Sequence, residues 1–184
     1  VENETTHLHG LFGAIKDATI KNLKLGAAGD QITLVGTSQN VVSAGALAGY
    51  AEGSTIVNVT NNVSVILTGD NPDATLMMLA GIAGCIKSTT IGGETKDDAV
   101  INNGDVKTGR ITNTANGGTG MNIGGICAFT LGAGTKLNYC TNNGEISAPT
   151  GRGGGLVGTL GGSTTEENGT VIANSTNNGT IQDD

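Results

Sequence analysis

The two histidines of this 184-residue chain are spaced so that they could share a metal ion. His7 and His9 alternate in a Thr-His-Leu-His-Gly segment, and alternate residues of an extended strand face the same side. Neutral imidazoles are common metal ligands, but the chain has no third histidine to complete such a site. We therefore interpret His7 and His9 as two exposed polar residues of a first strand.

Two acidic segments could offer oxygen ligands to a cation. The first, Asp70–Asp73, reads Asp-Asn-Pro-Asp, and the second contains Glu94, Asp97 and Asp98. Calcium takes about six to eight oxygen ligands, which neither segment supplies by itself, whereas Asp, Asn and Pro together are typical of turns. We predict a turn in the first segment and a solvated loop in the second.

Asp105 and Glu145 are the one pair of acidic residues at equivalent places, because each directly follows an Asn-Asn-Gly triplet. Paired carboxylates are the machinery of glycoside hydrolysis. In two related segments Ser64 and Thr180 stand at this place, so an exposed strand position explains the acidic pair without catalysis. No Ser-His-Asp or Cys-His set is recognisable. We assign no catalytic, cofactor-binding or metal-binding residue and expect no enzyme activity.

The three cysteines, Cys85, Cys127 and Cys140, lack the paired spacing of a zinc site. Either all three are buried free thiols or one pair forms a disulfide. Each cysteine lies in an apolar run, and a free cysteine packs as a small hydrophobic residue. We therefore favour buried thiols.

Aromatic side chains, which serve as stacking platforms for sugars, make up only 2 % of the chain. Tyr50 and Phe129 follow the same short motif in two different segments, and Cys85 follows it in a third. We expect these three side chains to stack on one another inside the fold. The remaining aromatic residues are Phe12 and Tyr139.

The composition excludes several classes of protein. Glycine accounts for 32 of 184 residues, more than twice its usual share of about 7 %. Two prolines and no three-residue glycine period exclude collagen, and scarce helix formers exclude a coiled coil. No apolar stretch approaches the roughly 20 residues of a membrane-spanning helix. A net charge of −7 without a basic stripe argues against nucleic acid as a partner.

Two short motifs recur in fixed order along the chain and predict a repeat architecture. The first is a small residue, Leu or Ile, an apolar residue and a second small residue, and its five copies begin 30 to 44 residues apart, at Gly10, Ala46, Gly81, Gly125 and Gly155. The second is an Asn-Asn pair followed by a β-prone segment, at Asn61, Asn102, Asn142 and Asn177. A variant of the second motif begins at Lys21.

The sequence of each repeat predicts up to three short strands. They are the first motif itself, a Thr-Ile-Val-like segment, and the residues after Asn-Asn-Gly. Val, Ile and Thr favour strands, and Asn and Gly tolerate the backbone of tight corners. Stacked coils about 4.8 Å apart would bury the apolar side chains and align the asparagines into amide ladders. We predict an all-β fold, a right-handed single-stranded parallel β-helix (β-solenoid) of about five glycine-rich repeats, forming one domain over residues 1–184. The third repeat carries an insertion around Gly92–Asp98.

The glycine-rich runs resemble the GLUG motif of bacterial proteins. Gly155–Gly158 and Gly10–Gly13 match its glycine-leucine-x-glycine core, and Ala18–Leu23 resembles the sequence that follows this core. The resemblance extends from about Leu8 to Ile181 and implies a parallel β-helix in secreted or cell-surface proteins. Such proteins are adhesin-like, or carry the repeat beside a separate catalytic domain.

The repeats depart from this motif at two places, because Ala46 and Ala128 replace motif glycines. The resemblance implies no catalytic residue. The chain begins Val-Glu-Asn-Glu, which is not a natural translation start, and both its ends fall within the repeat pattern. We therefore expect a piece of a longer chain, with capping segments elsewhere or with ends that dimerise.

We expect a non-catalytic, extracellular repeat region of a secreted or cell-surface bacterial protein, which acts as an adhesin-like binding surface or a rigid stalk. Its partner would be a glycan or an extracellular host protein, without membrane insertion. The alternative is a polysaccharide-degrading β-helix enzyme, a lyase or a glycosidase, whose acidic residues would come from Asp70–Asp73 and Glu94–Asp98. A third hypothesis is that the chain is a spacer that binds nothing.

Overall fold

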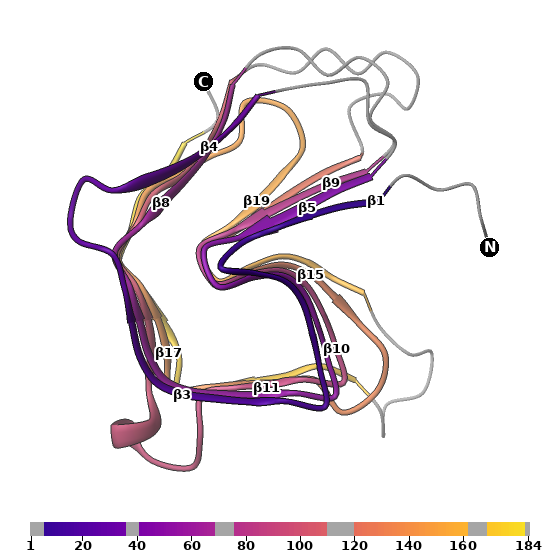
Figure 1. The fold of residues 1–184 in the computed structure, drawn as a ribbon, viewed down its shortest axis with the longest axis vertical. Helices are drawn as coiled ribbons and strands as arrows, with labels where there is room; N and C mark the ends of the chain where they lie inside the picture. The colour runs from indigo at the N-terminus through magenta and orange to yellow at the C-terminus, as the bar shows by residue number, and fades with distance from the viewer. Residues whose placement is uncertain (1–5, 36–40, 69–75, 110–119, 162–168, 183–184) are drawn as a thin grey trace.

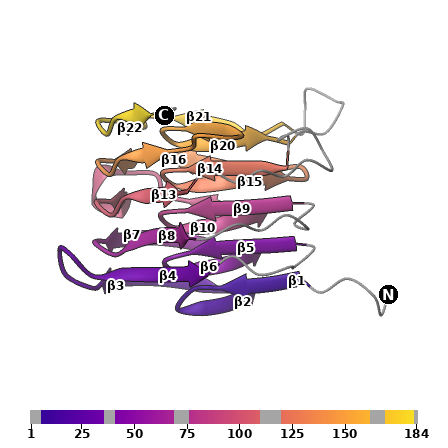
Figure 2. The same ribbon diagram turned by 90° about the horizontal axis from the view of Figure 1, so that it is seen from above.

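The computed structural model describes residues 6–35, 41–68, 76–109, 120–161 and 169–182, which form a stack of β-coils. Each coil contributes strands to four sheets, and every strand pair is parallel. In Figure 1 the chain turns clockwise as it recedes from the viewer, so the coil is right-handed. Figure 2 shows the coils stacked from β1 to β22. The predicted parallel β-solenoid of about five coils is confirmed.

Sheets A and B each take one strand from every coil. Sheet A contains β1 (Thr6–His9), β5 (Val41–Gly45), β9 (Leu76–Ala80), β14 (Met121–Gly124) and β19 (Arg152–Gly154). Sheet B contains β2 (Phe12–Lys16), β6 (Ala48–Glu52), β10 (Ala83–Lys87), β15 (Cys127–Leu131) and β20 (Val157–Leu160).

Each coil contributes to sheet C either one long strand or two short consecutive strands. Sheet D begins after the Asn-Asn corner. Sheet C contains β3 (Thr19–Leu25), β7 (Thr55–Asn61), β11 (Thr90–Ile91), β12 (Val100–Asn102), β16 (Lys136–Asn138), β17 (Cys140–Asn142), β21 (Val171–Ala173) and β22 (Thr176–Asn177). Sheet D contains β4 (Gln31–Val35), β8 (Ser64–Thr68), β13 (Val106–Thr108), β18 (Ile146–Ser147) and β23 (Ile181–Gln182). A 3-10 turn, η1 (Lys96–Asp98), lies between β11 and β12.

Sheets A and B form a V whose apex points into the coil (Figure 1). The small-Leu-x-small motif was predicted to be a strand, and this is wrong for its first half: in coils 2 to 5 the first two motif residues make the bend between the two sheets. The second small residue lets the sheets approach each other, because a Cβ on Gly49 of β6 would lie 2.7 Å from the backbone nitrogen of His9 and 2.8 Å from the carbonyl oxygen of Ser43.

The apex touches the Asn-Asn corner across the interior. A Cβ on Gly81, Gly125 or Gly155 would lie 2.3 Å from the amide carbon of an asparagine at that corner. Glycine is therefore required at the apex of these coils. The first coil has a shorter apex, since two residues separate His9 from Phe12 where three separate their partners Ala44 and Ala48. Alignment of the motifs would place Gly10 at the position of Ala46, but the strand register shows that Gly10 does not occupy that position.

The predicted asparagine ladders are present, and two of them run through four successive coils of the described residues. In the inner ladder the Nδ2 of Asn61 donates to the Oδ1 of Asn102 (2.8 Å), and the chain of bonds continues to Asn142 (2.7 Å) and Asn177 (2.8 Å). The first three of these side chains are fully buried. The outer ladder runs the other way, since each Nδ2 donates to the preceding coil, through Asn62, Asn103, Asn143 and Asn178.

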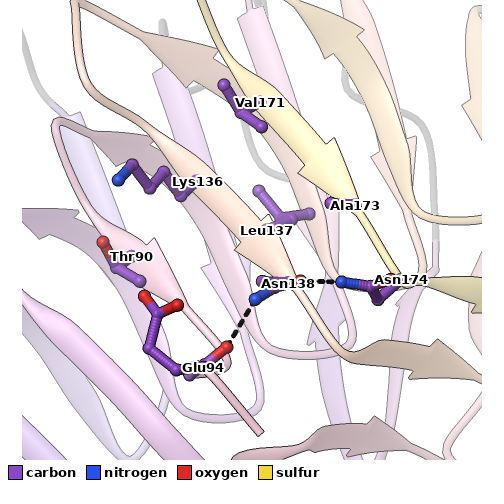
Figure 3. A pocket seen from close by; sticks show the side chains of 9 residues that line it. Thr90, Glu94, Lys136, Leu137, Asn138, Val171, Ala173 and Asn174 are labelled. Atoms are coloured by element: carbon purple, nitrogen blue, oxygen red, sulfur yellow. Dashed lines mark hydrogen bonds between the residues drawn. The ribbon is translucent and has the colours of Figure 1, made fainter.

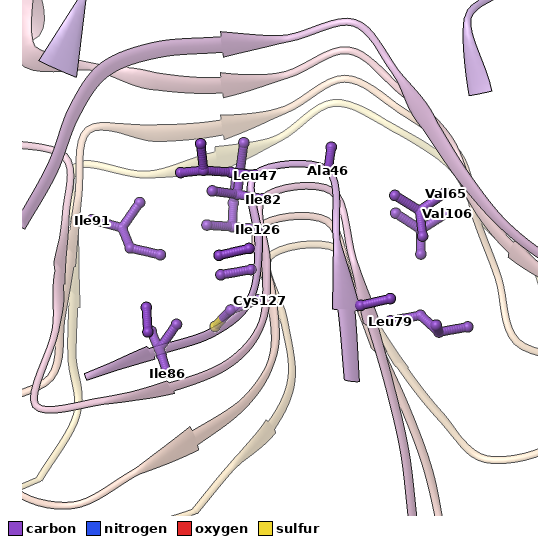
Figure 4. Close-up of a cluster of buried hydrophobic side chains, with 14 of the residues drawn as sticks. Ala46, Leu47, Val65, Leu79, Ile82, Ile86, Ile91, Val106, Ile126 and Cys127 are labelled. Carbon is purple, nitrogen blue, oxygen red and sulfur yellow. The ribbon is translucent and has the colours of Figure 1, made fainter. Parts of the chain in front are cut away.

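Aliphatic side chains fill the interior on both sides of the apex (Figure 4). Leu47, Ile82 and Ile126 stack on one side, while Leu79 and the sheet D valines lie on the other. Burial of each such leucine or isoleucine contributes about 1.5–3 kcal/mol. The repeat therefore acquires its core only by stacking, because one coil cannot cover its own apolar side chains.

The predicted insertion in the third repeat is confirmed. Ile91 pairs with Ile56 and Val100 with Val59, so eight residues stand in the third coil where the second has two. This segment, residues 92–99, includes η1 and projects beyond the wall of sheet C (Figure 1). No helix in the described part of the chain is long and apolar enough to cross a membrane.

Candidate functional site

A hollow of about 310 Å³ lies on the outer face of sheet C, beside the insertion. It is lined by Thr90, Gly93, Glu94, Lys136, Leu137, Asn138, Val171, Ala173 and Asn174. Figure 3 shows that these residues come from three successive coils and from the insertion. Thr90 and Lys136 are direct neighbours in the ladder, and Lys136 is followed by Val171.

Asn138 holds the insertion against the sheet. Its Nδ2 donates to the carbonyl oxygen of Gly93 at 2.6 Å, and its Oδ1 accepts a hydrogen bond from the Nδ2 of Asn174 at 2.9 Å (Figure 3). Gly92 has a φ of 80° at the start of the insertion, and a Cβ there would overlap the carbonyl oxygen of Asn138. These contacts fix the position of Glu94, two residues further on.

The insertion also carries its own stabilising bonds. Asp98 accepts hydrogen bonds from the hydroxyl and the backbone nitrogen of Thr95, at 2.9 and 3.3 Å. The predicted solvated loop is borne out for Glu94 and Asp97, which are exposed, whereas Asp98 is half-buried and structural. The Asp70–Asp73 segment lies outside the described residues.

The hollow carries two opposite charges that do not pair. Glu94 and Lys136 are both exposed, and neither forms an ion pair with another residue in the described segments. In this respect the hollow differs from two charged clusters elsewhere on the solenoid walls, where lysines and carboxylates lie within 4.0 Å of one another.

Asp105 and Glu145 belong to the first of these clusters. The Nζ of Lys107 lies 3.0 Å from the Oδ2 of Asp105 and 2.9 Å from the Oε2 of Glu145. The backbone nitrogen of Glu145 also donates to the Oδ1 of Asp105. Hydrogen bonds to Glu145 and then Asp105 raise the pKa of Lys107. The equivalent carboxylates are thus brought together, but around an ammonium group rather than a substrate-sized gap.

A second charged cluster lies on sheet B. Glu52 lies 3.0 Å from the Nζ of Lys87 and 4.0 Å from that of Lys16, the neighbours on either side in the ladder. The hydroxyl of Tyr50 donates to Glu52 at 3.3 Å. The hydrogen bond from Lys87 is the main cause that lowers the pKa of Glu52.

His7 and His9 face the same side of β1, as predicted, with ring centroids 6.2 Å apart. They are half-buried rather than exposed, because their ladder partners Val42 and Ala44 are buried on the inner face of sheet A. Burial, with a smaller effect of His7, lowers the pKa of His9. Within the described residues, no group of three or more His, Cys, Asp or Glu could hold a metal ion.

The three cysteines are buried free thiols, which confirms the favoured interpretation. Cys85 pairs in the ladder with Tyr50 and Phe129, so the predicted column exists. Its predicted place inside the coil is wrong: the column packs with Met78 in a second apolar cluster, separate from the main core. The neighbouring Ile86 faces the main core, so Cys85 points to the other face of sheet B.

Sequence reasoning singled out Glu94 but missed Lys136, Asn138 and Asn174. A signal was available, because an insertion between two strands of a solenoid must overhang the strands of an adjacent coil. Comparison with models of protein families, with curated proteins and with solved structures finds no match to this chain.

Proposed function

We propose that the chain is a non-catalytic repeat region of a secreted or cell-surface bacterial protein, which presents an adhesin-like binding surface on a rigid wall. The observation that carries this proposal is the continuous stack itself. Four parallel sheets bind each coil to the next, and two asparagine ladders join coils 2 to 5. Such a wall keeps surface groups at fixed spacing, which suits multivalent contact with an extended partner.

The arrangement of the carboxylates supports binding rather than catalysis. Glycoside hydrolysis uses two carboxyl groups flanking one bond, about 5–9.5 Å apart. The hollow beside the insertion is lined by one carboxylate, Glu94. Asp105 and Glu145 share the ammonium group of Lys107. The glycine-leucine-x-glycine runs at Gly10–Gly13 and Gly155–Gly158, each at a bend between sheets A and B, support kinship with GLUG-motif repeat proteins.

Affinity electrophoresis of the native protein through gels that contain plant and host polysaccharides tests the proposal, with reducing ends measured in the same lanes. We expect retardation without new reducing ends. New reducing ends would show cleavage and would replace this proposal with the lyase or glycosidase alternative. Retardation by no polysaccharide would leave a protein-binding surface or a stalk, and immobilised extracellular-matrix proteins would then be tested as partners.

A further inference from the structure

We propose that the hollow between the insertion and sheet C, lined by Glu94, Lys136 and Asn174, binds a neutral pyranose unit of a glycan. This inference rests on the proposed binding function and adds a site and a ligand class to it. The combination of a polar rim, an apolar floor and unpaired charges occurs at no other place that we find in the described segments.

The floor of the hollow matches the less polar face of a sugar ring. Val171 and Ala173 of β21 pair in the ladder with Lys136 and Asn138 of β16 and supply the apolar floor (Figure 3), whereas the side chain of Leu137 belongs to the main core. The side chain of Val171 is 54 % exposed, so its apolar surface is available to a ligand. The C–H groups of a pyranose ring would cover this aliphatic surface and remove it from water.

The rim offers both acceptors and donors for sugar hydroxyls. The exposed carboxylate of Glu94 accepts hydrogen bonds, and the exposed ammonium of Lys136 donates them. The Nδ2 of Asn174 is occupied by Asn138, which leaves its Oδ1 as a further acceptor. Hydrogen bonds to charged groups are stronger than those between neutral groups. A sugar hydroxyl can donate to the carboxylate or accept from the ammonium group, because it is both a donor and an acceptor.

The charge of the chain favours a neutral sugar over an acidic one. The net charge is −7, and the hollow offers a single ammonium group beside a carboxylate. A polyuronate would bring one carboxylate per sugar into this field and would be repelled at low ionic strength. A volume of about 310 Å³ lies at the lower end of ligand pockets, which suits one or two sugar units of a longer chain.

The test uses the whole protein and four variants. Glu94→Gln and Lys136→Met remove the two unpaired charges of the hollow. Their matched controls are Asp97→Asn, in the same insertion but outside the hollow, and Lys24→Met, which removes an exposed lysine elsewhere on sheet C. Circular dichroism and thermal unfolding establish that each variant keeps the fold. Binding is measured calorimetrically with neutral oligosaccharides derived from glucan, mannan, galactan and xylan, and with oligogalacturonate.

We expect at least one neutral oligosaccharide to bind, and each hollow variant to weaken its binding about tenfold or more, as for loss of a hydrogen bond to a charged group. The two controls should stay within about twofold. Equal binding by all four variants would place the site elsewhere and overturn the inference, while the binding function would stand. Binding of oligogalacturonate alone would overturn the ligand class. Absence of binding by every oligosaccharide would overturn the hollow as a glycan site, and release of reducing ends would overturn the proposed function itself.

Discussion

Gly125 and Asn142 meet inside the coil so closely that a Cβ on the glycine would lie 2.3 Å from the amide carbon of the asparagine. The two residues belong to the two motifs that recur along the sequence. The glycine is at the apex of the V between sheets A and B, and the asparagine is at the corner between sheets C and D. The motifs are therefore complementary parts of one contact across the interior.

Replacing Gly125 by alanine should weaken this contact and lower the free energy of unfolding by about 1–3 kcal/mol, as for an overpacked core. The added methyl group would also lie 2.2 Å from the carbonyl oxygen of Gly155. Urea-induced unfolding measures the effect. Gly109→Ala is the matched control, since a Cβ at Gly109 meets nothing within 4 Å. Equal stability of the two variants would show that the apex has room for a side chain.

The inner and outer ladders should differ sharply in their contribution to stability. Asn102→Ala removes a fully buried amide and leaves the Nδ2 of Asn61 and the Oδ1 of Asn142 without this partner. We expect a loss of about 1–3 kcal/mol for each buried group that stays unpaired. Asn103→Ala, the next residue, removes an exposed amide and should cost about 0.5 kcal/mol or less. Chemical denaturation of both variants gives the comparison, and similar losses would refute a structural role specific to the inner ladder.

The three thiols should be unreactive in the native protein at pH 8 and fully reactive in denaturant. Burial raises the pKa of Cys85 from 9.0 to about 11, and it raises the pKa of Cys127 as well. A thiol reagent should therefore count no thiols before unfolding and three after it. A count of one in denaturant would reveal a disulfide. Rapid reaction in the native state would place a thiol at the surface.

The same burial makes the free energy of unfolding depend on pH above 9.0, the pKa of an unperturbed thiol. The folded state keeps the proton of Cys85 up to about 11, whereas the unfolded state loses it near 9.0. The stabilisation is complete below pH 9.0 and declines as the pH rises through about 11, because only the unfolded state gains from ionisation in this interval. Urea unfolding at pH 8 and pH 10 measures the decline. Cys85→Ala should show a smaller decline than the unchanged protein.

Asn138 should act as a positioning residue for the insertion. Asn138→Ala removes the hydrogen bond to the carbonyl oxygen of Gly93, and we expect the insertion to open more often. Lys96 lies in η1, so trypsin cleavage after Lys96, followed by mass spectrometry, reports this opening. We expect cleavage to become several-fold faster while the melting temperature changes little. The control Asn143→Ala, in the outer ladder, should leave this cleavage unchanged.

The repeat, its length variation and the amide ladders could be predicted from sequence because they depend on residue types at recurring places. The inward V could not, because small-Leu-x-small fits a strand and a bend equally well. The face of the Tyr50–Cys85–Phe129 column depends on this bend, and it was therefore misplaced. In the hollow, Glu94 and Lys136 are 42 positions apart, and stacking of coils brings them together. The shorter apex at Gly10 could not be predicted either, because it follows from which residues of β1 and β2 pair with β5 and β6.

The opposite directions of the two asparagine ladders have an electrical consequence. A row of amides that all point one way adds its dipoles, as the peptide groups of an α-helix do, and the charge separation grows with length. Here the Nδ2 of Asn102 points to the next coil, whereas the Nδ2 of Asn103 points to the preceding one. Adjacent rows therefore cancel along the axis. Each further coil of this kind would add one amide to each of the two rows, so their dipoles would continue to offset each other as the stack grows.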